Sequence, residues 1–294
     1  MPVELSLESA LLEWKSWRID QKPINSKPSV IKQFTDGLNH DVALIRCDGE
    51  ELVLKVFESP NPTAIKAQVW AAHLNCAPRM LFCADDFSYC VMAKASGESI
   101  MPDTIERSQL SSIAKSLFSI HNAPRPEFTQ DDDVFNIIEF CDEYLLSANN
   151  LSSDNKATEL HKQVKPFLQT FISDPTHQCF CHNDLVVANC FFDQGHATFI
   201  DWEYAQVHNP WFDLAAIIYY NQLDQKQAMF FLDQYQTNWS DKVGTLIFYT
   251  SQLALLWGDM LWHLAKFGED YWQNLEQKHA DLNRLISIIV SLGE

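Results

Sequence analysis

The chain has 294 residues, of which 47% are hydrophobic and 20% are charged. This size predicts one large core or two lobes, and the composition excludes a disordered chain or a coiled coil as the main body of the protein. The net charge of −18 argues against a nucleic-acid partner, which needs a basic surface; the acidity either favours a cationic partner or substrate or simply keeps the protein soluble.

The first residues of the chain, Met1-Pro2-Val3-Glu4, lack the basic stretch and apolar run of a signal peptide. No apolar run approaches the roughly 20 residues that a membrane span needs. The eight cysteines include no C-x-x-C pair, so we expect them to be small buried side chains in a reducing compartment. We therefore expect a soluble, cytoplasmic protein with no membrane partner.

A short helix and a β-hairpin are predicted in the N-terminal part. Apolar side chains recur at helical spacing at Leu7, Ala10, Leu11, Trp14 and Trp17. Farther along, Asp48-Gly49 separates two apolar runs, at 42–47 and 51–57, which is a strong hairpin signal. The second strand alternates between two faces, with Leu52, Leu54 and Val56 on one and Val53, Lys55 and Phe57 on the other.

The pattern then changes from mixed to mainly helical. A helix over 63–74 is expected to bury a stripe through Ile65, Val69 and Ala72. Strand patterns follow at 80–83 and 89–92. Helical patterns occupy 110–121, 135–146, 160–171 and most of the chain after 210, with a short strand at 198–200.

These patterns predict an α+β fold in two lobes. A smaller N-terminal lobe, residues 1–93, would contain an antiparallel sheet. A larger and mainly helical lobe would comprise residues 94–294. The oligomeric state cannot be derived from the sequence.

The segment most informative about chemistry is 182–189, which reads H-N-D-L-V-V-A-N, followed by Asp201 at the end of a strand pattern. Phosphoryl transfer needs a carboxylate at the acceptor hydroxyl, oxygen ligands for Mg²⁺ and a cation on the nucleotide phosphates. Asp184 can supply the base, and Asn189 and Asp201 the metal ligands. Lys55, on an otherwise apolar strand, can supply the cation, because a lysine there is costly unless it is paired.

This arrangement resembles the kinase catalytic loop and metal-binding aspartate. His-Asn-Asp in place of His-Arg-Asp and Asp-Trp-Glu in place of Asp-Phe-Gly point away from protein kinases. The segments I-D-W-E-Y-A at 200–205 and N-P-W-F-D-L-A at 209–215 resemble the aminoglycoside phosphotransferase and choline kinase superfamily. They are most similar to its bacterial choline kinase-like and thiamine kinase-like members. The resemblance implies a bilobal protein-kinase-like fold that uses ATP and Mg²⁺. It implies that residues 1–93 form the nucleotide-binding lobe and residues 94–294 the catalytic and acceptor-binding lobe.

By resemblance, Asp184 is the catalytic base or the group that orients the acceptor hydroxyl, and Asn189 and Asp201 complete the catalytic set as Mg²⁺ ligands. His182 would support the catalytic loop, and Asp213 matches a structural aspartate that hydrogen-bonds it.

The nucleotide-binding residues are also assigned by resemblance. Lys55 would contact the phosphates, backbone N–H groups of Gly37, Leu38 and Asn39 would bind them, and Met92 would lie at the adenine edge. The family's helical glutamate partner of the lysine appears as Gln68. Lys55 would then be held more weakly or by another acid.

The acceptor site is predicted from a helix-like segment, 255–264, which resembles the substrate-binding helix of choline kinases. Its Asp-x-x-Trp pattern falls on Asp259 and Trp262, and a usual second tryptophan is absent. The candidate substrate residues are Glu203, Trp211, Trp257, Asp259 and Trp262. Aromatic faces and carboxylates hold quaternary ammonium groups, but the tryptophans could equally be core residues and Glu203 a surface residue.

The resemblance predicts an ATP- and Mg-dependent transfer of the γ-phosphate to a hydroxyl of a small cationic molecule, choline-like or thiamine-like. An aminoglycoside or another small alcohol is the first alternative acceptor. Gln68 and the glycine-poor loop leave open a kinase-like nucleotide-binding module without turnover. A metal-dependent hydrolase that uses the same carboxylates is a weaker alternative.

Overall fold

A computed structural model describes residues 6–34, 40–101, 104–130, 134–151, 155–172, 178–236 and 242–293, with the backbone alone at His40, Lys242, Glu269 and Asp270. The chain divides into two compact units. The first comprises residues 1–101, 108–128 and 187–205, and the second residues 102–107, 129–186 and 206–294. The expected nucleotide-binding lobe, 1–93, falls inside the first unit, and the division at residue 93 stays a prediction.

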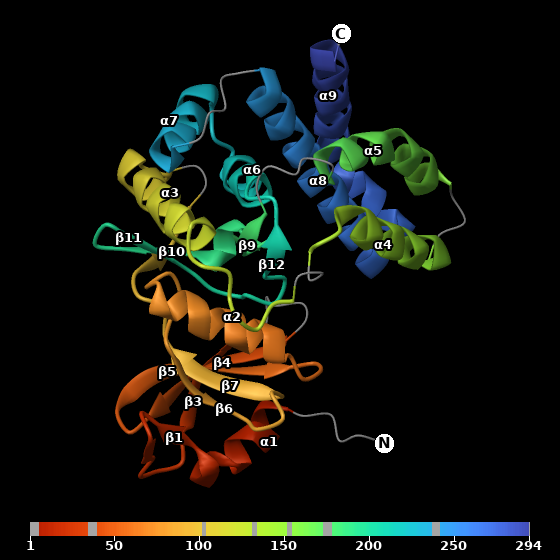
Figure 1. Cartoon of the computed structure of the whole chain (residues 1–294). Helices are drawn as coiled ribbons and strands as arrows, with labels where there is room; N and C mark the ends of the chain where they lie inside the picture. Colours follow the sequence, from red (N-terminus) through yellow and green to blue (C-terminus); the bar gives the residue numbers. More distant parts are fainter. Residues whose placement is uncertain are drawn as a thin grey trace. The chain divides into compact units, whose positions relative to one another are not determined.

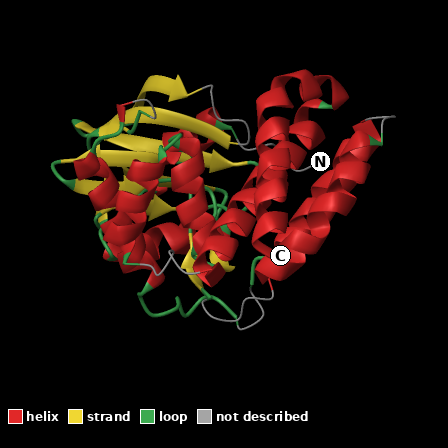
Figure 2. Ribbon diagram, turned by 90° about the horizontal axis from the view of Figure 1, so that it is seen from above, coloured by secondary structure: helices red, strands yellow, loops and turns green. Residues whose placement is uncertain are grey.

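A five-stranded antiparallel sheet forms the centre of the first unit (Figures 1 and 2). Its strands are β3 (Ser29–Phe34), β4 (His40–Cys47), β5 (Glu50–Phe57), β6 (Met80–Cys83) and β7 (Tyr89–Ala93), in the order β3-β4-β5-β7-β6. The predicted hairpin is confirmed between β4 and β5. Asp48 and Gly49 have φ values of 48° and 94°, the left-handed values that a two-residue hairpin turn of type I′ requires.

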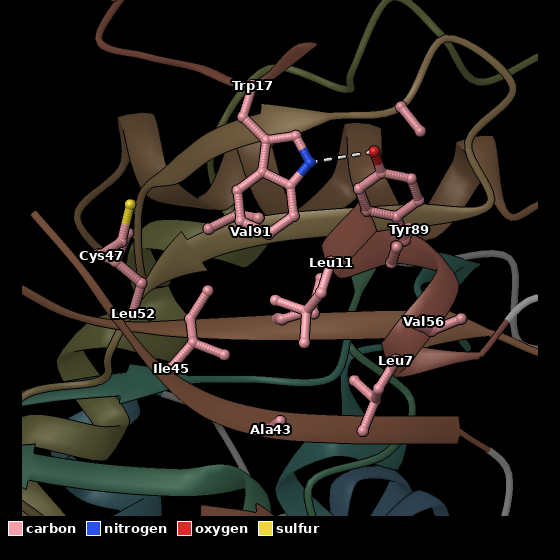
Figure 3. Packing of buried hydrophobic residues seen from close by; sticks show 13 residues of the cluster. Leu7, Leu11, Trp17, Ala43, Ile45, Cys47, Leu52, Val56, Tyr89 and Val91 are labelled. Carbon is pink, nitrogen blue, oxygen red and sulfur yellow. Dashed lines mark hydrogen bonds between the residues drawn. The ribbon is translucent and has the colours of Figure 1, made fainter. Parts of the chain in front are cut away.

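The two faces of this sheet belong to different hydrophobic clusters. Helix α1 (Leu7–Leu12) lies over one face, and Figure 3 shows Leu7 and Leu11 pointing into the cluster that contains Ile45 and Leu52. Trp17 closes this cluster, where its indole N–H donates to the Tyr89 hydroxyl at 3.1 Å. The strand alternation predicted for β5 is confirmed, because its even-numbered apolar residues lie in this cluster.

The opposite face of the sheet packs against α2 (Pro62–His73) through Phe57, Ile65 and Met92. The buried stripe of α2 differs from the predicted one. Val69 is 37% exposed, whereas Gln68 is 4% exposed. The reason is a hydrogen bond, which the Gln68 side-chain amide donates to the Pro78 carbonyl at 2.6 Å. This bond lets a polar side chain be buried that hydrophobic periodicity assigns to the surface.

A second sheet of the first unit is ordered β11-β10-β8. Its strands are β8 (Glu98–Ser99), β10 (Cys190–Asp193) and β11 (His196–Phe199). The Ser112 hydroxyl on α3 (Arg107–His121) donates to the Gly195 carbonyl at the hairpin tip. Beside β8, Gly97 has a φ of 78°, and a Cβ there would lie 2.0 Å from the Phe192 carbonyl oxygen, so only glycine permits this close approach.

The remaining short elements of the first unit are η1 (Trp14–Ser16), η3 (Val187–Asn189) and the strand pair β1 (Arg18–Ile19) and β2 (Lys22–Pro23).

The second unit is mainly helical. Its helices are α4 (Ile137–Leu151), α5 (Lys156–Ile172), α6 (Trp211–Tyr220), α7 (Gln225–Tyr235), α8 (Lys242–Phe267), η4 (Glu269–Leu275) and α9 (Glu276–Gly293). Helix α8 contacts α4, α5, α6 and α9, and is therefore the central helix of this unit (Figure 1). Strands β9 (Cys179–Cys181) and β12 (Gln206–His208) pair antiparallel beside these helices. Among the described residues, none of the helices combines the length and the apolar character that a bilayer crossing requires.

The predicted α+β class is confirmed: sheets dominate the N-terminal part and helices the C-terminal part.

Candidate active site

The predicted catalytic loop begins where β9 ends, in the second unit, and a buried aspartate holds it. Asp213, on the first turn of α6, is 0% exposed. Its two carboxylate oxygens accept the backbone N–H groups of His182 and Asn183, each at 2.8 Å. Hydrogen bonds to a buried carboxylate are among the strong ones in proteins. The predicted structural role of Asp213 is confirmed.

Asn183 has a φ of 64°, a left-handed value that costs energy for a residue with a side chain. Its side chain is fixed from β12, because His208 Nδ1 lies 2.9 Å from Asn183 Oδ1 and the amide nitrogen donates to the Gln206 carbonyl at 3.5 Å. With the amide oriented in this way, His208 Nδ1 carries the hydrogen and donates. These bonds stabilise the residue that directly precedes Asp184.

His208 is a buried and neutral histidine. It is 4% exposed, and the rings of Phe135 and Phe212 lie 4.8 Å from its ring centre. Burial lowers the pKa of His208 from 6.5 to about 3, although nearby Asp213 acts in the opposite direction. Within the described residues, His208 Nε2 has no hydrogen-bond partner. The ring therefore acts on the loop as a neutral donor.

The predicted base, Asp184, is partly exposed, as a group that meets a substrate must be. Its backbone N–H donates to His182 Nδ1 at 3.2 Å, and His182 is 0% exposed. His182 therefore supports the loop through its ring nitrogen, in agreement with the role expected from the sequence.

The two predicted metal ligands lie together in the first unit. Asn189 ends η3 just before β10, and Asp201 follows β11 with a φ of 67°. The Asn189 carbonyl accepts the Ile200 backbone N–H at 3.0 Å. Since β10 and β11 pair in register, this bond closes the base of their hairpin. An amide side chain and a carboxylate thus emerge from neighbouring positions at one end of the sheet.

Lys55 forms an ion pair with Asp201. Lys55 Nζ, on β5, lies 2.6 Å from Asp201 Oδ1, and the two side chains are 10% and 33% exposed. The Phe57 ring lies 5.2 Å from the same ammonium. Gln68 is hydrogen-bonded to the Pro78 carbonyl instead of to Lys55, and the acid that holds Lys55 is Asp201. A buried lysine needs such a partner.

The side chains next to the Lys55–Asp201 ion pair are mainly apolar. Cys90 pairs with Lys55 across β5 and β7 and is 0% exposed. Burial raises the pKa of the Cys90 thiol to about 12, with a smaller opposing effect of Lys55. Met92, the predicted adenine-edge residue, is 9% exposed and lies in the same cluster as Cys90. The predicted phosphate-binding residues Gly37, Leu38 and Asn39 lie outside the described residues.

The acceptor candidates on α8 have different surroundings. Trp257 is 0% exposed, and its indole N–H donates to His161 Nδ1 on α5 at 2.9 Å. Trp257 is therefore a core residue of the second unit. Trp262 is partly exposed, and its ring packs edge-on against His263.

Asp259 is surrounded by polar groups of two other helices, α6 and α9, and by His263 of its own helix. Its Oδ1 accepts the Tyr220 hydroxyl at 3.3 Å and lies 3.5 Å from His263 Nδ1. Its Oδ2 is ion-paired with Lys278 on α9. The Asp259 side chain is 15% exposed. Its charge is thus already compensated within the chain.

The other two candidates belong to different units. Trp211 belongs to the second unit, is 9% exposed and packs edge-on against Phe248. Glu203 belongs to the first unit and is partly exposed.

Sequence reasoning missed three residues: His208, Tyr220 and Lys278. His208 stands directly between two motif segments, in H-N-P-W-F-D, and this position could have drawn attention to it. Lys278 is an ordinary lysine on an amphipathic helix, and nothing in the sequence distinguishes it from a surface residue.

Comparisons with known proteins show the family of the chain. The model of the "Phosphotransferase enzyme family" matches residues 30–256. Protein LicA of Haemophilus influenzae strain Rd is 26% identical over 251 residues, which cover 81% of this chain and 90% of that protein.

Two solved structures share the fold. The choline kinase from Cryptosporidium parvum has a TM-score of 0.74 at 16% identity and covers 98% of this chain and 97% of its own. The choline kinase LicA from Streptococcus pneumoniae has a TM-score of 0.70 at 18% identity and covers 88% of this chain and 94% of its own. The resemblance read from the sequence is confirmed: the chain belongs to the phosphotransferase enzyme family and is a phosphotransferase.

Proposed function

We propose that the protein is a cytoplasmic small-molecule kinase that transfers the γ-phosphate of ATP to the hydroxyl of a small cationic alcohol, with Mg²⁺ as cofactor. The observation that carries the proposal is the grouping of Lys55, Asp201 and Asn189 at one end of the first unit. Family membership and the kinase relatives support it. Residues 1–93 would form the nucleotide-binding lobe, and residues 94–294 the rest.

The metal ligands would be the Asn189 side-chain oxygen and the Asp201 carboxylate. Both are hard oxygen donors of the kind that Mg²⁺ prefers. Bound there, the ion would neutralise charge on the nucleotide phosphates. The Lys55 ammonium, which lies 2.6 Å from Asp201 Oδ1, would contact the same phosphates. Gly37, Leu38 and Asn39 would bind the phosphates through backbone N–H groups.

The chemical step would use Asp184. The acceptor hydroxyl oxygen forms a bond to the γ-phosphorus while the bond from that phosphorus to the bridging oxygen of the nucleotide breaks. The hydroxyl proton passes to the Asp184 carboxylate. Asp213 and His208 would keep this carboxylate in place through His182 and Asn183.

The acceptor is proposed to be choline-like or thiamine-like. The net charge of −18 favours a cation, and choline kinases and an ethanolamine kinase are among the similar proteins. Asp259 and Trp262 offer a carboxylate and a partly exposed aromatic ring. Trp257 and Trp211 are left out of this site because they are buried. Glu203 remains a candidate contact.

The test is a nucleotide-consumption assay with Mg-ATP and choline, ethanolamine, thiamine or an aminoglycoside. We expect acceptor-dependent ADP formation with one of the first three compounds. Replacing the base by Asp184→Asn should lower kcat at least 100-fold, as expected for loss of general base catalysis. The exposed turn variant Asp85→Asn is the matched control and should keep wild-type turnover.

Other outcomes of this assay identify the alternatives. Turnover with aminoglycosides alone would replace the choline-like acceptor. Binding of Mg-ATP without turnover of any alcohol would indicate a nucleotide-binding module. Phosphate release that needs no acceptor would indicate a hydrolase.

A further inference from the structure

The carboxylate proposed to bind the acceptor cation already holds a cation of this chain. Lys278 Nζ forms an ion pair with Asp259 Oδ2, and the two side chains are 25% and 15% exposed. Both partners are largely removed from water, so their attraction is screened less than that of a surface pair. The other oxygen of Asp259 accepts the Tyr220 hydroxyl at 3.3 Å and lies 3.5 Å from His263 Nδ1, which is also 2.7 Å from the Asp259 backbone carbonyl. Both carboxylate oxygens of Asp259 therefore already contact groups of this chain, and a cationic ligand would have to displace one of them.

Aromatic rings adjoin this ion pair. The His263 and Tyr271 rings stack at 5.2 Å and 17°, and the Phe267 and Tyr271 rings at 4.8 Å and 25°. Trp262 packs edge-on against His263. A carboxylate beside aromatic faces has the composition of a site for an organic ammonium group.

A second lysine of the chain lies over the same aromatic group. Lys266 Nζ is 5.2 Å from the centre of the Trp262 ring. The chain thus places an ammonium group both on the carboxylate and on the half-exposed ring. These are the two contacts that a cationic ligand would make.

Within the second unit, Tyr220 lies near both Asp259 and the proposed catalytic base, Asp184. Its hydroxyl donates to Asp259. Burial raises the pKa of Tyr220 well above its usual value, and the negative charges of Asp259 and Asp184 raise it further. One hydroxyl therefore lies within electrostatic range of both carboxylates.

We propose that Lys278 is a specificity-determining residue whose ammonium is a built-in competitor for the acceptor's positive charge. A cationic acceptor binds Asp259 by displacing Lys278, so this lysine weakens the binding of cations and leaves neutral alcohols unaffected. The inference rests on the proposed function, which puts the acceptor at Asp259. It makes Lys278 the residue that sets the affinity of the protein for a cationic acceptor.

The test compares choline with its uncharged carbon isostere, 3,3-dimethylbutan-1-ol. Calorimetry measures the binding of each to the wild-type chain and to Lys278→Met. Removing an ion pair of about 1 kcal/mol corresponds to a factor of about five, so choline should bind about fivefold or more tightly to the variant. The isostere should bind equally to both proteins. In turnover, KM for choline should fall by the same factor with little change in kcat.

Two further variants separate competition from a structural effect. Lys278→Arg keeps the charge and should keep the wild-type affinity for choline. Lys162→Met removes an exposed lysine that is paired with Glu159 within α5 and should change neither ligand's affinity. Thermal unfolding of each variant shows that it is folded, and Lys278→Gln serves if the methionine variant is not.

Equal or weaker binding of choline to Lys278→Met overturns the inference and leaves Lys278 as a contact that joins α9 to α8. Absence of choline binding to every variant overturns it too. Both results differ from failure of the proposed function, which is shown by the absence of turnover with every alcohol tested.

Discussion

Asp213→Asn removes one of the two acceptor oxygens that hold the predicted catalytic loop. The carboxylate is fully buried and receives backbone N–H groups of His182 and Asn183 at 2.8 Å each. Asparagine keeps one oxygen but turns an NH₂ group toward the other N–H, so one hydrogen bond is lost and two donors face each other. A hydrogen bond to a charged group contributes about 1.5–3 kcal/mol, and a buried unsatisfied donor costs about 1–3 kcal/mol.

We expect Asp213→Asn to lower the free energy of unfolding by about 2–4 kcal/mol. The loop that carries Asp184 should also lose its fixed geometry, and a displacement of about 1 Å costs about 100-fold in rate. The nine tryptophans report urea unfolding by fluorescence, and steady-state kinetics give kcat. Asp85→Asn is the control in both assays. An Asp213→Asn variant with a wild-type unfolding midpoint and a wild-type kcat would refute the argument.

Two further predictions concern stability. Since the pKa of His208 falls from 6.5 to about 3 on folding, the stability that its neutral form provides is complete above about pH 6.5 and is lost as the pH falls toward 3. Between pH 6.5 and 5 the wild type should lose about 2 kcal/mol more unfolding free energy than His208→Phe, measured by urea titration, and parallel profiles would contradict this. Gly97→Ala should be clearly less stable than Gly195→Ala in thermal unfolding. Both glycines have positive φ, but only at Gly97 would the new Cβ collide with the Phe192 carbonyl, at 2.0 Å. Equal melting temperatures would show that the backbone moves away at little cost.

Local sequence signals predicted the elements of the fold well. The Asp48-Gly49 turn and the alternation along β5 depend on neighbouring residues only, and both are confirmed. Asp213 was also found, because its motif segment carries a family resemblance. The failure at α2 has a different origin. Val69 is more hydrophobic than Gln68, yet Gln68 is buried, since a carbonyl ten residues along the chain accepts its amide hydrogen.

Contacts between distant segments account for what the sequence did not reveal about the site. The acid that pairs with Lys55 could not be identified, because Asp201 is 146 residues away. The same holds for the partners of Asp259 and Asn183, which come from other helices and strands. Tryptophan count suggested an aromatic cage, but composition does not distinguish the half-exposed Trp262 from the buried Trp257.

The β10–β11 hairpin has a consequence for how homologous chains could vary in length. Asn189 and Asp201 stand at its base, and the paired strands fix their separation. An inserted residue within either strand would turn every following side chain to the opposite face and separate the two oxygen donors. At the tip, a Cβ on Gly195 would meet nothing within 4 Å. Extra residues there would cost little beyond the bond from Ser112, so length variation should accumulate at the tip and be excluded from the strands.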